Sequence, residues 1–84
     1  MIYVAMTVGY WGIGETVVDA KAAARKVGSK ERMNGKGWLV KRLPVGAKDV
    51  SVDEMGTIHW EWAPGADHDG RVEVVERPTA KGRY

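Results

Sequence analysis

The chain has no cysteine among its 84 residues, and this absence excludes disulfide bonds, thiolate zinc sites and thiol nucleophiles. It also has no run that approaches the roughly 20 apolar residues of a membrane-spanning helix. The N-terminus lacks the charged start and the long apolar run of a secretory signal. We therefore expect a cytoplasmic protein with no membrane partner.

Groups suited to catalysis or metal binding are scarce as well. The chain has two histidines, and its serines, Ser29 and Ser51, lie in no nucleophile motif. Residues 67–70 (Asp-His-Asp-Gly) are similar to part of a calcium-binding loop, but no bidentate glutamate follows at the required spacing. We therefore predict no enzymatic activity, no cofactor and no metal site.

What the chain does contain is an uneven distribution of charge. Its net charge is +2, but residues 21–42 alone carry a net charge of +7 and residues 43–77 a net charge of −5. Four tryptophans and three tyrosines are present, without any phenylalanine. Opposite charges on two parts of one small domain predict two surfaces of different electrostatic potential.

The first predicted elements are a strand and a helix. Residues 2–8 alternate in polarity, which predicts a strand whose even-numbered side chains face the core. Residues 9–14 carry three glycines around two aromatic residues, and we predict a loop there. Thr16 is the expected helix N-cap, with Asp19 completing an approximate capping box. Small apolar residues at a period of 3.6 then predict a helix over residues 17–27.

The remainder of the chain predicts strands joined by connections too short for parallel crossovers. We expect them at residues 37–43, 50–52, 57–62 and 71–76. The fold class is therefore α+β, an antiparallel sheet of four to five strands with one helix packed on one face, in the order β-α-β-β-β(-β). Residues 1–78 form a single domain, and residues 79–84 are predicted to be a flexible tail.

Residues 9–16 have the glycine spacing of a phosphate-binding loop between a strand and a helix. Glu15 stands where such a loop needs lysine, and a carboxylate there would repel phosphates. Two interpretations of the aromatic pair remain open. Tyr10 and Trp11 either pack over the sheet edge or form an exposed hot spot for a partner.

The basic region 21–42 also has two interpretations. It is either a solvated helix face with a polar loop, or a surface that binds phosphates or an anionic protein. Trp60 and Trp62, two apart on one predicted strand, either share a packed sheet face or stack nucleic-acid bases, and Trp38 has the same ambiguity. The candidate partner-binding residues are Tyr10, Trp11, Lys21, Arg25, Lys26, Lys30, Arg32 and Lys36.

The run Gly9-Tyr10-Trp11-Gly12-x-Gly14-x-Thr16, followed by Asp19-Ala20-x-x-Ala23, resembles the opening of small proteins encoded by phages and prophages. Small phage anti-CRISPR proteins share the layout of an antiparallel sheet with one helix. The resemblance covers about the first third of the chain and assigns no functional residue. It implies a protein that works by covering a surface of a host complex.

Three functions follow from these observations. The first is a non-enzymatic interaction protein, such as a phage-encoded inhibitor that binds a host defence or nucleic-acid-handling complex. The second is a basic nucleic-acid-binding domain that uses the helix and the loop after it. The third is a structural protein that forms oligomers, such as a homodimer, through its tryptophan-bearing strands.

Overall fold

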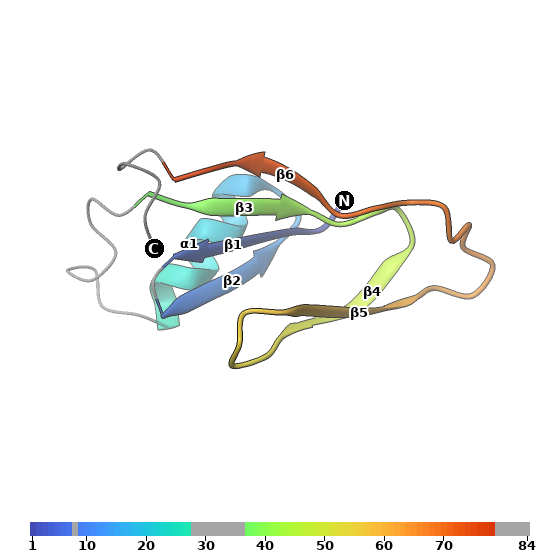
Figure 1. Ribbon diagram of the computed structural model, residues 1–84, viewed down its shortest axis with the longest axis horizontal. Helices are drawn as coiled ribbons and strands as arrows, with labels where there is room; N and C mark the ends of the chain where they lie inside the picture. Colours follow the sequence, from blue (N-terminus) through green and yellow to red (C-terminus); the bar gives the residue numbers. More distant parts are fainter. Residues whose placement is uncertain (8, 28–36, 79–84) are drawn as a thin grey trace.

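The computed structural model describes residues 1–7, 9–27 and 37–78 of the chain. It confirms the α+β class, with one helix and an antiparallel four-stranded sheet of order β2-β1-β3-β6, and adds a second sheet of two strands (Figure 1). The predicted tail, residues 79–84, and the polar loop after the helix, residues 29–36, lie outside the described residues. The elements are β1 (Tyr3–Thr7), β2 (Tyr10–Gly14), α1 (Val17–Val27), β3 (Leu39–Arg42), β4 (Ala47–Val52), β5 (Ile58–Trp62) and β6 (Glu73–Glu76).

The prediction of a loop over residues 9–14 is wrong, because Tyr10–Gly14 forms strand β2 and pairs antiparallel with β1. Its glycines serve close packing. A Cβ atom on Gly12 would lie 2.2 Å from the backbone nitrogen of Ala24, and one on Gly14 would lie 2.5 Å from that of Ala20. Helix α1 therefore rests directly on the backbone of β2, where no side chain fits.

The predicted helix is confirmed over Val17–Val27. Its first turn is capped as expected, since the backbone N–H of Asp19 donates a hydrogen bond of 3.0 Å to Thr16 Oγ1. The alanine face packs inward, with Ala20 and Ala24 fully buried. Residue 28, the predicted helix stop, lies outside the described residues.

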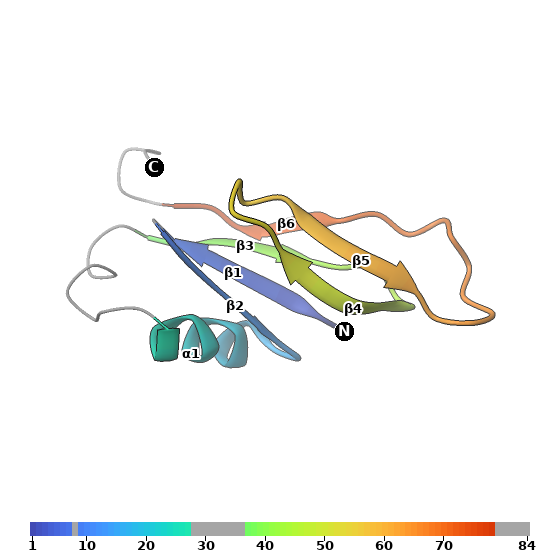
Figure 2. The ribbon, with the colours of Figure 1, turned by 90° about the horizontal axis from the view of Figure 1, so that it is seen from below.

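The later strands are divided between two sheets. Strands β4 and β5 form a hairpin of their own, and β6 returns to pair with β3. The chain leaves the main sheet after β3 at Pro44 and Gly46, which has a φ of 95°. Figure 2 shows the result, with helix α1 on one side of β1 and β2 and the β4–β5 hairpin on the other.

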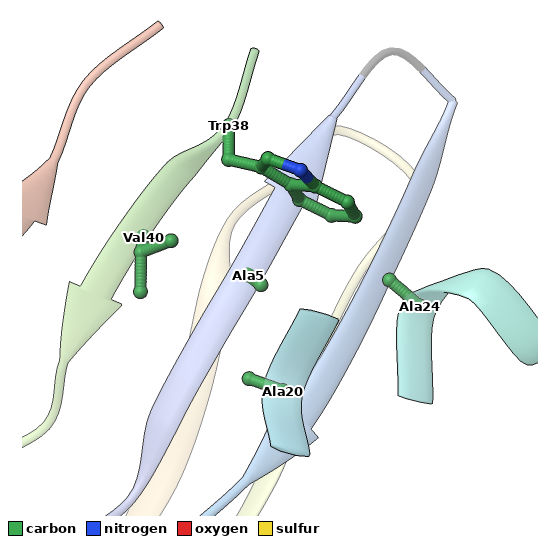
Figure 3. Close-up of a cluster of buried hydrophobic side chains, with 5 residues drawn as sticks. All are labelled: Ala5, Ala20, Ala24, Trp38 and Val40. Carbon is green, nitrogen blue, oxygen red and sulfur yellow. The ribbon is translucent and has the colours of Figure 1, made fainter. Parts of the chain in front are cut away.

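Both faces of the central sheet are consequently buried. On the helix face, Ala5 and Val40 meet the helix alanines beneath Trp38, which extends across β1 (Figure 3). On the opposite face, Val4 and Leu43 pack against Val52 and the partly buried apolar side chains of the hairpin. The prediction that Val4 faces the core is confirmed, but its neighbour Ala5 is equally buried on the other side.

Candidate functional site

A groove of about 450 Å³ opens where the turn of the β1–β2 hairpin meets the turn of the β4–β5 hairpin. Both turns lie toward the same end of the molecule (Figure 1). One wall comes from the ends of β1 and β2, and the other comes from the end of β4 and the turn after it. The groove is lined by Met6, Thr7, Gly9, Tyr10, Trp11, Val52, Asp53, Glu54, Met55 and Gly56.

The position of Trp11 follows from the two-residue period of strand β2. Tyr10, Gly12 and Gly14 face the helix, so Trp11 and Ile13 face the hairpin side. Ile13 packs against the hairpin-side core. Trp11, two residues nearer the β1–β2 turn, is 38% exposed. The strand therefore presents an indole ring to the groove.

The opposite wall is a turn organised by the carboxylate of Asp53. Its Oδ1 accepts hydrogen bonds of 2.9 Å from the backbone N–H groups of Met55 and Thr57. Its Oδ2 accepts a hydrogen bond of 2.8 Å from Nε2 of His59 on β5. The hydrogen bond from His59, followed by those from the backbone, lowers the pKa of Asp53 below its ordinary value. Asp53 is thus ionised and committed to holding the turn.

The same turn exposes two further side chains beside Trp11. Met55 is 87% exposed, a large fraction for an apolar side chain. Glu54 is exposed as well, and within the described part of the chain its carboxylate has no hydrogen-bond or ion-pair partner. Among the described residues, those that line the groove include two acidic side chains and no basic one. The groove therefore combines exposed apolar surface with negative charge.

Of the predicted aromatic pair, the structure places only Trp11 on an exposed surface. Tyr10 is half-buried and packs against the helix-side core with Ala5 and Ala24. The two residues are adjacent on one strand, so their side chains point to opposite faces of the sheet. They line the same groove from different sides but do not form one aromatic patch.

The predicted basic surface is partly occupied by intramolecular contacts. Lys21 was expected to point toward water, but its Nζ forms an ion pair of 2.9 Å with Glu76 on β6, and its side chain is only 20% exposed. Lys21 and Arg25 also lie 5.8 and 5.4 Å from the ring centre of Trp38. Arg25 and Lys26 are exposed. The other predicted basic residues, Lys30, Arg32 and Lys36, lie outside the described residues.

The other three tryptophans contact side chains of their own chain. Trp38 is buried. Trp60 and Trp62 share one face of β5, as predicted, with their rings edge to face at a centroid distance of 6.0 Å. Trp62 also stacks on His68 at 4.9 Å with the rings 15° from parallel. These contacts favour the packing interpretation of all three residues over base stacking.

Glu54 and Met55 were missed as candidate site residues because their segment reads as an ordinary polar turn. The available signal was Met55 itself. A large apolar residue between Glu54 and Gly56, at the centre of a tight turn, cannot be buried by that turn and so must be either exposed or covered by another segment.

Neither a cluster of metal-ligating side chains nor a membrane-spanning helix is found in the ranges that the structure describes. They contain no group of three or more histidine, aspartate or glutamate side chains placed to hold a metal ion. No helix within the same ranges has the length and apolar character needed to cross a membrane.

The fold and the groove define a small α+β protein with an open groove between two hairpin turns. Comparison of the chain with protein-family models, with curated proteins and with solved structures finds no match. The functional argument therefore rests on the chemistry of the groove.

Proposed function

We propose that this protein is a non-enzymatic interaction protein that binds a protein partner through the groove between its two hairpin turns. The observation that carries the proposal is the juxtaposition of Trp11, exposed Met55 and Glu54, whose carboxylate has no partner among the described residues. Tryptophan and methionine are enriched where proteins bind proteins. An exposed apolar side chain on a turn gains stability only when a partner covers it.

The size and the resemblance to small phage proteins support one kind of partner. A protein of this size acts most readily by occupying a surface that a larger complex needs. We propose a host defence or nucleic-acid-handling complex as that partner, with the protein acting as a phage-encoded inhibitor.

The two other candidate functions have weaker structural support. Direct nucleic-acid binding would use Arg25 and Lys26, which are exposed at the end of α1, but Lys21 is already paired with Glu76. Oligomer formation through the tryptophan-bearing strands would use Trp60 and Trp62, which contact side chains of their own chain.

Affinity capture from a host-cell lysate with matched variants tests the proposed function. Met55→Ser removes an apolar side chain from the groove, whereas Val18→Ser removes one that is 73% exposed on helix α1. We expect a stoichiometric protein partner with the wild type and with Val18→Ser, and at least a tenfold loss with Met55→Ser, since hot-spot side chains contribute about 1–2 kcal/mol or more.

Equal capture by both variants would remove the groove as the binding site. Recovery of naked nucleic acid alone, released by rising salt, would overturn the proposal in favour of the basic-domain function.

A further inference from the structure

The two edges of the main sheet differ in how well they are protected against pairing with another strand. Strand β6 has a register shift opposite Val40 and Lys41 of β3, and charged Glu73 and Glu76 occupy its two ends. Bulges and charges are the devices by which natural sheets block added strands. Strand β2 pairs with β1 in continuous register over five residues, and it contains neither a charge nor a proline. Among the described residues, neither device is therefore present at the β2 edge.

The register of β1 and β2 identifies the backbone groups that lie on this edge. Two residues separate Thr7 from Tyr10, which face each other across the hairpin. In a two-residue hairpin the residues that flank the turn form a hydrogen-bonded pair, and such pairs alternate along the ladder. Gly12, which pairs with Ala5, thus turns its N–H and C=O inward to β1. Trp11 and Ile13 turn theirs outward.

This edge lies beside the groove. In Figure 2, β2 is at the near edge of the sheet, with α1 on one side and the β4–β5 hairpin on the other. A strand added to β2 would place alternate side chains on the face to which Trp11 points. A side chain opposite Trp11 would have its Cβ about 5 Å from that of the tryptophan, and so would enter the groove.

We infer that the β2 edge is a strand-docking site, where an extended segment of a protein partner pairs with Trp11 and Ile13 and inserts an arginine or lysine side chain into the groove. The inference rests on the proposed function and adds the mode of binding and the chemistry of the partner. Strand addition takes affinity from main-chain hydrogen bonds and specificity from pockets for alternate side chains. Here the pocket is the groove.

Charge selects a cationic side chain for that pocket. Among the described residues, Asp53 and Glu54 are the acidic side chains that line the groove. Asp53 already accepts three hydrogen bonds within its turn, whereas Glu54 has no partner among the described residues. An ammonium or guanidinium group is stabilised both by the face of an indole ring and by a carboxylate. Trp11 and Glu54 supply these two groups from opposite walls.

Amide hydrogen exchange measured by NMR on the isotope-labelled protein tests the docking mode. The probe is the peptide acetyl-Thr-Val-Arg-Val-Thr-amide, in which two β-branched residues stand on each side of one arginine. We expect the peptide to slow exchange at the amides of Trp11 and Ile13 and to leave that of Gly12 unchanged, because Gly12 already bonds to β1. Unchanged exchange at both Trp11 and Ile13 would overturn strand docking.

Two matched comparisons test the cationic pocket. Replacing arginine in the probe by citrulline, which is neutral and of the same shape, should weaken binding about three- to tenfold. Glu54→Gln should weaken binding of the arginine peptide about two- to fivefold. Glu61→Gln removes an exposed carboxylate from outside the groove and should have no effect. Equal affinities for both peptides, or equal effects of both variants, would refute the pocket.

The outcomes separate this inference from the proposed function. Failure of the peptide experiment, with capture still lost in Met55→Ser, would refute strand docking and leave groove binding in place. Slowed exchange at Trp11 and Ile13 that depends on protein concentration without peptide would assign the edge to a second copy of the chain. That result would overturn the inference.

Discussion

The two faces of the central sheet are packed by opposite means. On the helix face, backbone meets backbone, because Gly12 and Gly14 of β2 leave no atoms between the strand and helix α1. On the hairpin face, branched and aromatic side chains from β1, β2, β4 and β5 fill the space. Among the described residues, Trp38 is a large side chain buried on the helix face, where it extends across β1 in one cluster with Ala20 and Ala24 (Figure 3). One sheet thus carries a layer made by backbone contact and a layer made by side chains.

This difference shows which face can carry a binding site. Contact between backbones has little freedom to adapt, because it contains no side chains that could change rotamer and repack. The side-chain layer between the main sheet and the β4–β5 hairpin ends at the hairpin turn. Trp11 and Met55 lie there and are exposed. The groove accordingly lies on the hairpin face, at the end of its cover.

The largest effect is expected from adding one methyl group between the backbones of β2 and helix α1. In Gly12→Ala, the new Cβ would lie 2.2 Å from the nitrogen of Ala24 and 2.4 Å from the oxygen of Ala20, both backbone atoms. The helix must move off the strand, so we expect a loss of more than about 3 kcal/mol in the free energy of unfolding. Urea unfolding followed by circular dichroism measures this loss.

Gly56→Ala is the matched control for that experiment. Gly56 has a φ of 83° and open space around its missing Cβ. Its substitution should therefore cost only the left-handed backbone penalty of about 1 kcal/mol. If Gly12→Ala were no more destabilising than Gly56→Ala, the direct contact of helix and strand would be refuted.

A smaller effect is expected from truncating a large side chain on the hairpin face. Leu43 is 1% exposed in the hairpin-side core, and Leu43→Ala should cost about 3 kcal/mol through lost burial and the cavity that remains. On the helix face, Ala20→Gly removes a single methyl group and should cost about 1 kcal/mol. Denaturant midpoints of the two variants compare the faces directly. Equal losses would contradict the assignment of the large-side-chain core to the hairpin face.

The smallest effect concerns the turn that forms one wall of the groove. The hydrogen bond from His59 lowers the pKa of Asp53 in the folded state from the ordinary 3.8. A lowered folded-state pKa contributes stability at pH values above 3.8 that is lost as the pH falls through the folded-state value. We therefore expect Asp53→Asn to be less stable than the wild type near neutral pH, and the difference to shrink in acid.

Thermal unfolding across an acid pH series measures this dependence. Glu54→Gln is the control, because it leaves the hydrogen bonds of Asp53 in place and should retain the acid-dependent loss of the wild type. A difference between wild type and Asp53→Asn that stayed constant with pH would contradict the role of the ionised Asp53 in holding the turn.

The sequence by itself determined the elements whose causes are local. Helix α1 follows from Thr16, which caps it, and from small apolar residues at helical spacing that bury Ala20 and Ala24. The turn over residues 53–56 follows from an aspartate whose side chain accepts backbone hydrogen bonds two and four residues later. Each of these depends on residues within one or two turns of chain, so pattern and composition were sufficient.

Only the tertiary structure decided that residues 10–14 are a strand. Glycine is a poor strand former, so composition predicts a loop there, and the helix that needs bare backbone beneath it comes later in the chain. As part of this strand, Tyr10 and Trp11 face opposite sides of the sheet. Trp11 thereby lies beside a turn more than 40 residues away in the sequence. The ion pair between Lys21 and Glu76 likewise joins residues that are far apart in the sequence. A groove built from segments this distant exists only once packing has fixed which face each strand turns outward.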